Sequence, residues 1–312
     1  MTMPQRPLGR TGLAVAPVAF GTAPLGELFG PLDESAALRL VDEALDLGIN
    51  FIDSSRYYGS AEERLGKALT PAKRDRVVLS TKAGRYGFAD FDYSRAGVRR
   101  GIEESLRLLR TDHVDILMLH DVEFVDLAGP FGEGFEELRR IRDEGLCRFI
   151  GLSGYPLHTI RRAMMELDLD VVLTYAKGCL LDNSIHDELL PLADERVIGL
   201  INAAAVALGL LTPGEWTIEI EHPATPPMRE AAARMRALCA DRGVDIGFVA
   251  NQYAIQASGC PTTLVGTRKA AHLRAAVEAV AAPLDLVLVN ALLDLRPPVG
   301  SRQWISGLPQ NN

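Results

Sequence analysis

The sequence predicts an α/β protein: a (β/α)8 TIM barrel with an N-terminal β-hairpin and a C-terminal tail. First, eight apolar, β-rich runs are separated from one another by segments with helical periodicity. Second, most of these runs are continuous rather than alternating in polarity, which is typical of parallel strands covered on both faces. Third, 312 residues without a Pro/Gly/Ser-rich linker fit one barrel, expected over residues 1–312 as a single domain.

The expected strands follow the chain in an order that suits a closed parallel barrel. A doubly wound open sheet is the main alternative, but it needs a G-x-G-x-x-G fingerprint after the first strand. The sequence there, GTAPLGELFG, has the wrong spacing. The eight expected strands are Val18–Ala23, Ile49–Asp53, Val77–Lys82, Val114–His120, Arg148–Ser153, Val171–Tyr175, Val197–Ala203 and Thr262–Thr267.

Helix signals fill the intervals between the strands. Asp33 precedes the amphipathic segment ESAALRLVDEALD as an N-cap, and Gly48 supplies a stop. Two further helical segments lie within residues 92–110 and 131–145. Outside the repeat, Gly9 and Gly12 predict a hairpin that closes the barrel floor. A proline-rich loop over residues 212–227 follows the seventh strand, where long loops usually serve ligands.

Composition and charge exclude several classes of function. The formal net charge of −8 and the pI of about 5.4 oppose non-specific binding of nucleic acid. No apolar run reaches the roughly 18 residues that span a bilayer, so we expect no membrane segment. The start, MTMPQRPLGRTG, lacks the apolar core of a signal peptide, which predicts a cytoplasmic protein. The four cysteines are widely spaced without histidines at ligand spacing, so we expect reduced thiols and no metal.

Titratable side chains occur where the second, third and fourth expected strands end. Asp53 closes the second strand, and Tyr58 lies in the loop beyond it. Lys82 closes the third strand and His120 the fourth. Because active sites of this barrel lie at the carboxyl ends of the strands, these four are the candidate catalytic residues. Taken singly, each has another explanation, such as a cap for Asp53, a solvated strand end for Lys82 or packing for a tyrosine.

The order and spacing of these four residues resemble the aldo-keto reductase family, in which an Asp is followed five residues later by Tyr, then by a strand-end Lys and a strand-end His. The similarity runs from LGRTGLAVAPVAFGT to TTLVGTRKAAHL and includes DSSRYYG, LSTKAG and LMLHD. Within the family the chain is most similar to sugar dehydrogenases that act on L-galactose, L-fucose and related aldoses, through LGINFIDSSRYYG and HDVEF. The resemblance implies an oxidoreductase that transfers a hydride between a sugar and a nicotinamide.

The residue types suit this chemistry. A free tyrosine has a pKa near 10, so it is a poor acid or base at neutral pH unless a cation stabilises its phenolate. Lys82 can supply that cation, and Asp53 would hold Lys82 in place. In the oxidation direction, Tyr58 would accept the proton of the C1 hydroxyl of an aldose while a hydride leaves, which gives a lactone. His120 would orient the reacting oxygen.

The resemblance also implies a cofactor site along the strand ends. NAD is expected, with NADP as the alternative, because Gly266 and His272 stand where NADP-preferring relatives often carry Lys and Arg. Arg268 and Lys269 are candidates to replace those cations. The loop after the seventh strand would cover the diphosphate through its backbone N–H groups. The candidate cofactor residues are Gly21, Thr22, Ser153, Gly154, Tyr175, Ala204, Val206, Leu208, Gly209, Gly266, Thr267, Arg268 and His272.

A small-molecule sugar or aldehyde is the expected partner of the loops beyond the strands, in a monomer or homodimer. Aromatic and charged side chains suit a polyhydroxylated ring, Arg85 and Glu123 among them, although packing explains each of them equally well. The tail that carries Trp304 is expected to fold over the mouth of the site. Two other functions stay open: the same chemistry on other aldehydes or pyridoxal, and a non-catalytic regulatory subunit that binds the cofactor. The candidate substrate residues are Phe29, Tyr57, Tyr86 and Trp216.

Overall fold

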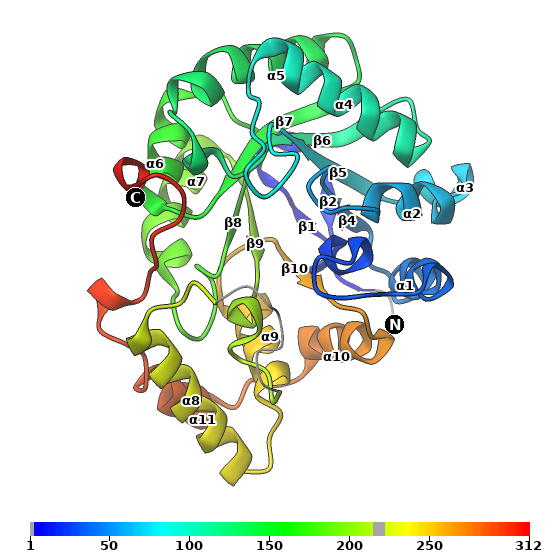
Figure 1. The fold of residues 1–312 in the computed structure, drawn as a ribbon. Helices are drawn as coiled ribbons and strands as arrows, with labels where there is room; N and C mark the ends of the chain where they lie inside the picture. The colour runs from blue at the N-terminus through cyan, green and yellow to red at the C-terminus, as the bar shows by residue number, and fades with distance from the viewer. Residues whose placement is uncertain (1–2, 215–221) are drawn as a thin grey trace.

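A computed structural model gives the structure of the protein and describes residues 3–214 and 222–312. Eight parallel strands close into a barrel in the order β10-β3-β4-β5-β6-β7-β8-β9, which confirms the predicted TIM barrel (Figure 1). Each strand overlaps one of the expected runs. The strands are β3 (Val18–Gly21), β4 (Phe51–Asp53), β5 (Val78–Ala83), β6 (Val114–Leu119), β7 (Cys147–Gly154), β8 (Val171–Tyr175), β9 (Gly199–Ala203) and β10 (Thr262–Gly266).

Both faces of the barrel wall are apolar. Ile116 and Ile201 belong to the cluster that fills the barrel interior. Their neighbours Leu117 and Leu200 point the other way and pack with the apolar faces of the surrounding helices. Successive side chains of a strand alternate between the two faces, so a strand that is buried on both sides reads as a continuous apolar run.

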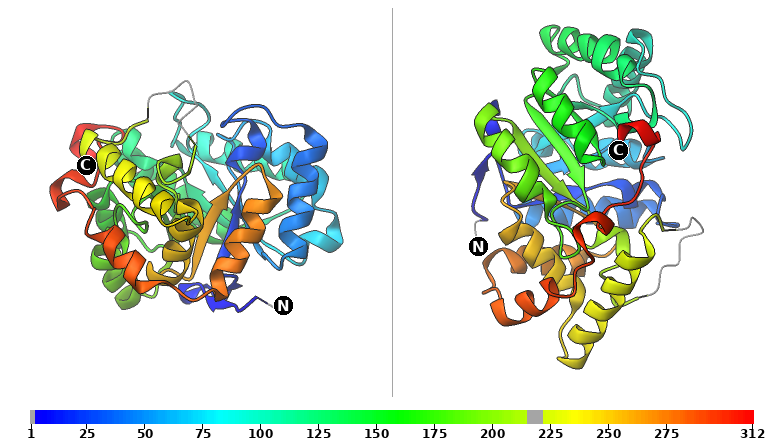
Figure 2. Two further views of the ribbon diagram at one scale, coloured as in Figure 1. Left: turned by 90° about the horizontal axis from the view of Figure 1, so that it is seen from below. Right: turned by 90° about the vertical axis from the view of Figure 1, so that its left-hand side faces the viewer.

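The N-terminal hairpin closes one end of the barrel, as predicted. Strands β1 (Arg6–Pro7) and β2 (Ala14–Val15) pair antiparallel, and Figure 2 shows this hairpin at the N-terminal edge of the molecule. Leu8 and Leu13 are buried and join the interior cluster, so the hairpin seals the floor with apolar side chains. Gly9 has φ +52°, and a Cβ there would lie 2.2 Å from the backbone nitrogen of Gly199. The floor therefore requires glycine at this position.

Helices cover the outside of the barrel (Figure 1). The first begins as predicted, because the Asp33 carboxylate accepts a hydrogen bond from the Ala36 N–H and Gly48 follows its end with φ +83°. The helical segment predicted within residues 131–145 differs slightly, because it begins with a π-helical turn over Pro130–Gly134. The helices are α1 (Glu34–Asp46), α2 (Ala61–Ala68), α3 (Pro71–Arg74), α4 (Arg95–Leu109), α5 (Phe135–Asp143), α6 (Leu157–Glu166), α7 (Leu190–Arg196), α8 (Pro226–Asp241), α9 (Ile246–Ala257), α10 (Ala270–Ala281) and α11 (Leu286–Leu293).

The C-terminal tail follows α11 and belongs to a second apolar cluster, which also holds residues of α8 and α9. Trp304 is buried in this cluster and stacks on Tyr155, with ring centroids 4.1 Å apart. Farther along, the Leu308 N–H donates to the Glu123 carbonyl, so the tail crosses the loop after β6. Among the described residues no single helix is long and apolar enough to cross a membrane; α10 and α11 reach that length only together, across a bend of 108°.

Candidate active site

The four catalytic candidates lie at the carboxyl-terminal rim of three neighbouring strands. Asp53 is the last residue of β4 and pairs in register with Ser80 of β5. Lys82 lies two residues farther along β5, and His120 directly follows β6. Parallel strands place their carboxyl ends on the same rim, so residues 29 and 38 positions apart in the sequence become neighbours. The loop after β4 then brings Tyr58 back over this rim.

Asp53, Lys82 and Tyr58 form a connected chain of contacts. The Lys82 ammonium donates to Asp53 Oδ2 at 2.5 Å and to the Ser54 carbonyl at 2.9 Å, and its Nζ lies 3.4 Å from the Tyr58 hydroxyl. Ser80, which the sequence did not single out, donates its hydroxyl to Asp53 Oδ1 at 2.6 Å. Both carboxylate oxygens of Asp53 are therefore engaged. The strand-end aspartate is paired with a buried cation rather than stranded in an apolar wall.

The electrostatic balance at Tyr58 differs from the one expected. Burial is the largest influence and raises the pKa of Tyr58 to about 12, while Lys82 opposes it and Asp53 reinforces it. Burial also lowers the pKa of Lys82, but the combined attraction of Asp53 and Tyr58 outweighs it, and the net pKa is raised. At neutral pH the pair is therefore a lysine ammonium next to a neutral phenol. A neutral phenol beside a cation is arranged to donate a proton, and the ammonium lowers the cost of the phenolate that remains.

His120 shares a hydrogen bond with a serine that was not among the predicted site residues. Ser55 Oγ lies 2.8 Å from His120 Nδ1, and Ser55 is completely buried. The rings of Tyr58 and His120 meet edge to face, with centroids 5.6 Å apart. Burial, and secondly the charges of Lys82 and Arg85, lowers the pKa of His120 well below its usual value. The imidazole is therefore neutral at pH 7 and can only donate from one nitrogen and accept at the other.

A buried ion pair borders the histidine. Arg85 donates from a terminal nitrogen to Asp121 Oδ2, and the same carboxylate oxygen lies 3.6 Å from His120 Nε2. The guanidinium also lies over the ring of Tyr57, 4.0 Å from its centroid, and over that of Phe124 at 4.6 Å. Asp121 follows His120 directly in the motif LMLHD, so its position next to a predicted site residue was the only signal for it. The pair gives this wall of the site both a donor and an acceptor.

The cofactor candidates at the ends of β3 and β7 have different surroundings. Gly21 ends β3, and the hydroxyl of the following Thr22 lies 3.0 Å from the Asp53 carbonyl and 2.9 Å from Ser54 Oγ. Thr22 is completely buried, so its side chain braces β4 and is not free for a ligand. Ser153, at the end of β7, accepts a hydrogen bond from the Asp121 N–H at 3.3 Å.

Gly154 lies against a buried carboxyl group. A Cβ at this position would be 2.9 Å from Glu123 Oε2. Glu123 Oε1 accepts from the Tyr155 N–H at 3.1 Å and from the Ser306 hydroxyl at 2.9 Å, so this carboxyl joins β7 to the C-terminal tail. Burial, and secondly Asp121, raises the pKa of Glu123 to about 8. For Glu123, contact with the substrate and packing were equal alternatives, and the structure places its carboxyl against the tail.

The loop after β9 carries several residues in the left-handed backbone region. Ala204, Ala207 and Leu208 have φ between +48° and +56°, and Gly209 has φ +109°. Three of these residues are consecutive, so the chain turns tightly here, and the N–H groups of Ala207 and Gly209 donate to the Ala204 and Val206 carbonyls at 2.8 and 3.0 Å. Val206 lies within this loop, Tyr175 ends the neighbouring strand β8, and both are partly exposed. The role of this loop in covering a cofactor diphosphate stays a prediction.

The candidates after β10 face one another. Thr267 Oγ1 lies 3.0 Å from His272 Nδ1 and also accepts from the Lys269 N–H at 3.0 Å. Arg268 is exposed, and its guanidinium donates to the Pro31 carbonyl at 3.4 Å across the rim. Gly266 ends β10 and adds no side chain. Arg268 and the exposed Lys269 are therefore the two cations at this corner, and Arg268 would have to leave the Pro31 carbonyl to bind a cofactor phosphate.

The structure separates the substrate candidates. Tyr57 lies beside His120, with ring centroids 5.8 Å apart. Phe29 is partly exposed in the loop between β3 and α1. The Tyr86 hydroxyl donates to the Gly97 carbonyl at 2.7 Å and accepts from the Gly84 N–H, so it is bound to the start of α4. Its proposed contact with substrate finds no support in these bonds. Trp216 lies outside the described residues.

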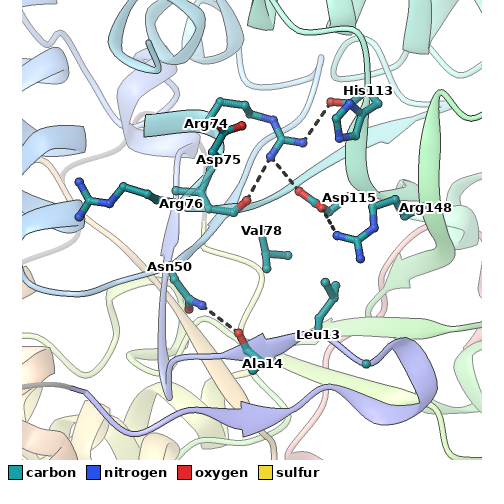
Figure 3. Close-up of a pocket in the computed structure, with 12 residues that line it drawn as sticks. Leu13, Ala14, Asn50, Arg74, Asp75, Arg76, Val78, His113, Asp115 and Arg148 are labelled. Carbon is teal, nitrogen blue, oxygen red and sulfur yellow. Dashed lines mark hydrogen bonds and ion pairs between the residues drawn. The ribbon is translucent and has the colours of Figure 1, made fainter. Parts of the chain in front are cut away.

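Two open surface pockets lie away from this rim. Figure 3 shows one of about 410 Å³ at the barrel floor, beside the hairpin residues Leu13 and Ala14. Arg74 and Arg148 border it, but both guanidinium groups are paired with Asp115, at 3.0 and 2.8 Å. The other, of about 320 Å³, lies between the C-terminal tail and the start of α6. Neither contains a predicted site residue, so the candidate site rests on the rim geometry.

The closed eight-stranded barrel, with titratable residues along its carboxyl-terminal rim, places the chain among the TIM-barrel enzymes. Residues 17–293 match the model of the aldo/keto reductase family, and the chain belongs to this family. It is 37% identical to L-galactose dehydrogenase of Arabidopsis thaliana over 98% of each chain. It is 29% identical to D-threo-aldose 1-dehydrogenase of a Pseudomonas species, over 91% of this chain and 95% of that one.

A solved structure agrees with this assignment. An aldo-keto reductase from Bacillus halodurans in its holo form superposes with a TM-score of 0.78 and 26% identity, over 96% of this chain and 100% of the other. The predicted family and fold are thus confirmed. The protein is an oxidoreductase of a family that uses NAD(P)H and acts on small molecules.

Proposed function

We propose that the protein is an NAD-dependent aldose 1-dehydrogenase, which oxidises the C1 hydroxyl of a sugar to a lactone with Tyr58 as the acid/base. The observation that carries the proposal is the position of the Lys82 ammonium, 2.5 Å from the Asp53 carboxylate and 3.4 Å from the Tyr58 hydroxyl, next to a neutral histidine. The likeness to two sugar dehydrogenases supports the choice of substrate class.

The side chains divide the proton chemistry between them. In oxidation Tyr58 reacts as the phenolate, which the Lys82 ammonium stabilises, and it becomes the neutral phenol when it accepts the proton of the substrate hydroxyl. His120 donates a hydrogen bond to the reacting oxygen and fixes its distance from Tyr58. The bound nicotinamide supplies the hydride acceptor, and the loop at residues 204–209 is the part of this chain that would hold its diphosphate through backbone N–H groups. Reduction runs the same proton transfer in reverse.

A polyhydroxylated substrate suits the wall beside His120. Arg85 and Asp121 place a donor and an acceptor next to the histidine, and both are largely buried. The Tyr57 ring adds an apolar face against which a sugar ring can lie. Hydroxyl groups on adjacent carbons can hydrogen-bond to both members of such an ion pair, whereas an aromatic aldehyde has no second polar group to do so.

NAD is favoured over NADP at the corner after β10. Gly266 adds no side chain, and the His272 ring is engaged by the Thr267 hydroxyl at 3.0 Å. Arg268 reaches away to the Pro31 carbonyl. A 2′-phosphate would have to draw Arg268 from that contact or rely on the exposed Lys269, whereas a free ribose hydroxyl needs neither cation.

Turnover with a panel of aldoses tests the proposal directly. The purified protein is mixed with NAD or NADP and with L-galactose, L-fucose or D-arabinose, and formation of the reduced nicotinamide is followed by absorbance. Tyr58→Phe should lose at least about 10²-fold in activity and keep its affinity for NAD. Tyr253→Phe is the matched control, because its hydroxyl contacts Arg296 within another part of the fold.

The alternatives give different results in the same assay. Reduction of aromatic aldehydes or oxidation of pyridoxal without turnover of any aldose would keep the chemistry and change the substrate. Tight NAD binding without turnover of any compound would favour the non-catalytic regulatory subunit. A fully active Tyr58→Phe variant would remove the phenol from the mechanism.

A further inference from the structure

Ser55 is a buried hydroxyl whose contacts all lead to the candidate site. It has no exposed surface, and its Oγ lies 2.8 Å from His120 Nδ1. The same oxygen accepts a hydrogen bond from the Tyr57 N–H at 3.1 Å. Asp53 precedes Ser55 by two residues, so the loop that leaves β4 carries both the lysine partner and the histidine partner.

The proton count at Ser55 selects one tautomer of the imidazole. Ser55 Oγ carries a single proton and already accepts one hydrogen bond from Tyr57. If His120 Nδ1 were protonated it would donate to Oγ, and the Ser55 proton would then be buried without an acceptor among the described residues. If Nδ1 is unprotonated, the Ser55 hydroxyl donates to it and every group is satisfied. An unmade buried hydrogen bond disfavours the first arrangement by roughly tenfold or more.

The surroundings of His120 Nε2 favour the same tautomer. His120 Nε2 lies 3.6 Å from Asp121 Oδ2, and that oxygen is itself bound by Arg85. A carboxylate oxygen near Nε2 attracts an N–H and repels a lone pair. The Arg85 ion pair keeps Asp121 from taking the Nε2 proton as a full hydrogen bond. The Nε2–H group is therefore available to donate a hydrogen bond to a ligand.

We infer that Ser55 is a positioning residue that holds His120 as the Nε2–H tautomer, with that N–H directed at the reacting oxygen of the substrate. The inference rests on the proposed function for the role of the oxygen, but the hydrogen bond and the tautomer are properties of the protein alone. The structure offers one other explanation, in which Ser55 only stabilises the turn through the Tyr57 N–H. The two explanations make different predictions for the imidazole.

Nitrogen NMR tests the tautomer without substrate. The full chain is labelled with 15N-histidine, and long-range 1H–15N spectra show which ring nitrogen carries the proton; His120→Gln assigns the His120 signal among the six histidines. We expect a neutral ring with the proton on Nε2. In Ser55→Ala the Nδ1 resonance should move toward that of an acceptor without a hydrogen bond. A proton on Nδ1 in the parent, or an unchanged Nδ1 resonance in Ser55→Ala, would overturn the inference.

Kinetics test the consequence. Ser55→Ala should lower kcat by about 10- to 100-fold because the donor is no longer held in place, with the Kd for NAD within about threefold of the parent. Ser55→Thr keeps the hydroxyl and should restore most of the rate. Ser258→Ala is the matched control, since Ser258 is equally buried and its Oγ accepts the N–H of Cys260, also two residues on, before β10 begins at the floor. It should leave kcat unchanged.

The two readouts separate this inference from the proposed function. If the parent oxidised no sugar, the proposed function would fail, and the spectra would still decide the tautomer. If sugars were oxidised but Ser55→Ala kept the parent kcat, the proposed function would stand and the positioning role would be refuted. Should Ser55→Ala unfold, the tautomer of the parent and the rate of Ser55→Thr still give the decision.

Discussion

Substitution of Lys82 by Met tests the core of the proposed proton transfer. Met keeps most of the volume of the side chain and removes its charge. Coulomb's law at an effective dielectric constant of about 20 gives about 5 kcal/mol for unit charges 3.4 Å apart, the distance from Lys82 Nζ to the Tyr58 hydroxyl. Without the ammonium, a phenol whose pKa is already raised to about 12 becomes still harder to ionise. We expect sugar oxidation to fall by about 10³-fold, within the usual range for acid/base catalysis.

The same substitution affects stability, and the two effects can be separated. Lys82→Met leaves the Asp53 carboxylate, which is 2% exposed, without its cation, at a cost of about 3–5 kcal/mol. At about 2 cal/mol/K of unfolding entropy per residue over 312 residues, Tm should fall by about 5–8 °C. The double variant Asp53→Asn/Lys82→Met removes both charges. It should regain most of the stability and none of the activity.

Steady-state oxidation at saturating NAD, NAD titrations and thermal unfolding together give the answer. NAD affinity should stay within about threefold of the parent in both variants. If Lys82→Met kept activity within tenfold of the parent, Lys82 would have no electrostatic role at the phenol. If the double variant recovered activity along with stability, the loss in Lys82→Met would reflect damage to the fold.

Three further predictions concern charge. Because burial raises the pKa of Tyr58 to about 12, sugar oxidation should accelerate by about tenfold per pH unit from pH 7 to 9, and a flat profile would assign the base to another group. The pKa of Glu123 is raised to about 8 from an ordinary 4.5, so the folded state loses stability as this carboxyl ionises with rising pH. Between pH 5 and 8 the free energy of unfolding of the parent, measured with denaturant, should fall by about 3–4 kcal/mol more than that of Glu123→Gln. Equal losses in the two proteins would contradict the burial of this carboxyl. Arg268→Ala should change the Kd values of NAD and NADP by the same factor, whereas a selective tenfold loss of NADP would show that Arg268 binds the 2′-phosphate.

The strand order and the candidate residues at the rim could be predicted from the sequence, because both depend on local patterns. Continuous apolar runs mark buried parallel strands, and the residue at which each run stops lies on the common rim of the barrel. Asp53, Lys82 and His120 could therefore be grouped without coordinates, and the structure places Lys82 in contact with Asp53 and Tyr58. The hairpin at the floor was equally local, through Gly9 and Gly12.

These patterns do not predict which side chains from distant parts of the chain contact one another. Thr22 and Tyr86 follow strand ends as expected, but their hydroxyls bind β4 and the start of α4, respectively. Ser55 is one of two adjacent serines, and nothing in DSSRYYG tells which of them reaches His120, 65 residues away. Such contacts depend on the angle at which separate loops leave the rim, which no spacing in the sequence encodes.

The chain by itself determined which groups would meet, and only the tertiary structure decided how they share their protons. A lysine next to a tyrosine suggested an acidic phenol, yet the enclosed site raises the pKa of Tyr58 to about 12. Ion pairs can be inferred from residue types, because attraction needs only two opposite charges at the same rim of the barrel. Desolvation depends on every atom that excludes water from the hydroxyl, and those atoms come from elements spread along the chain.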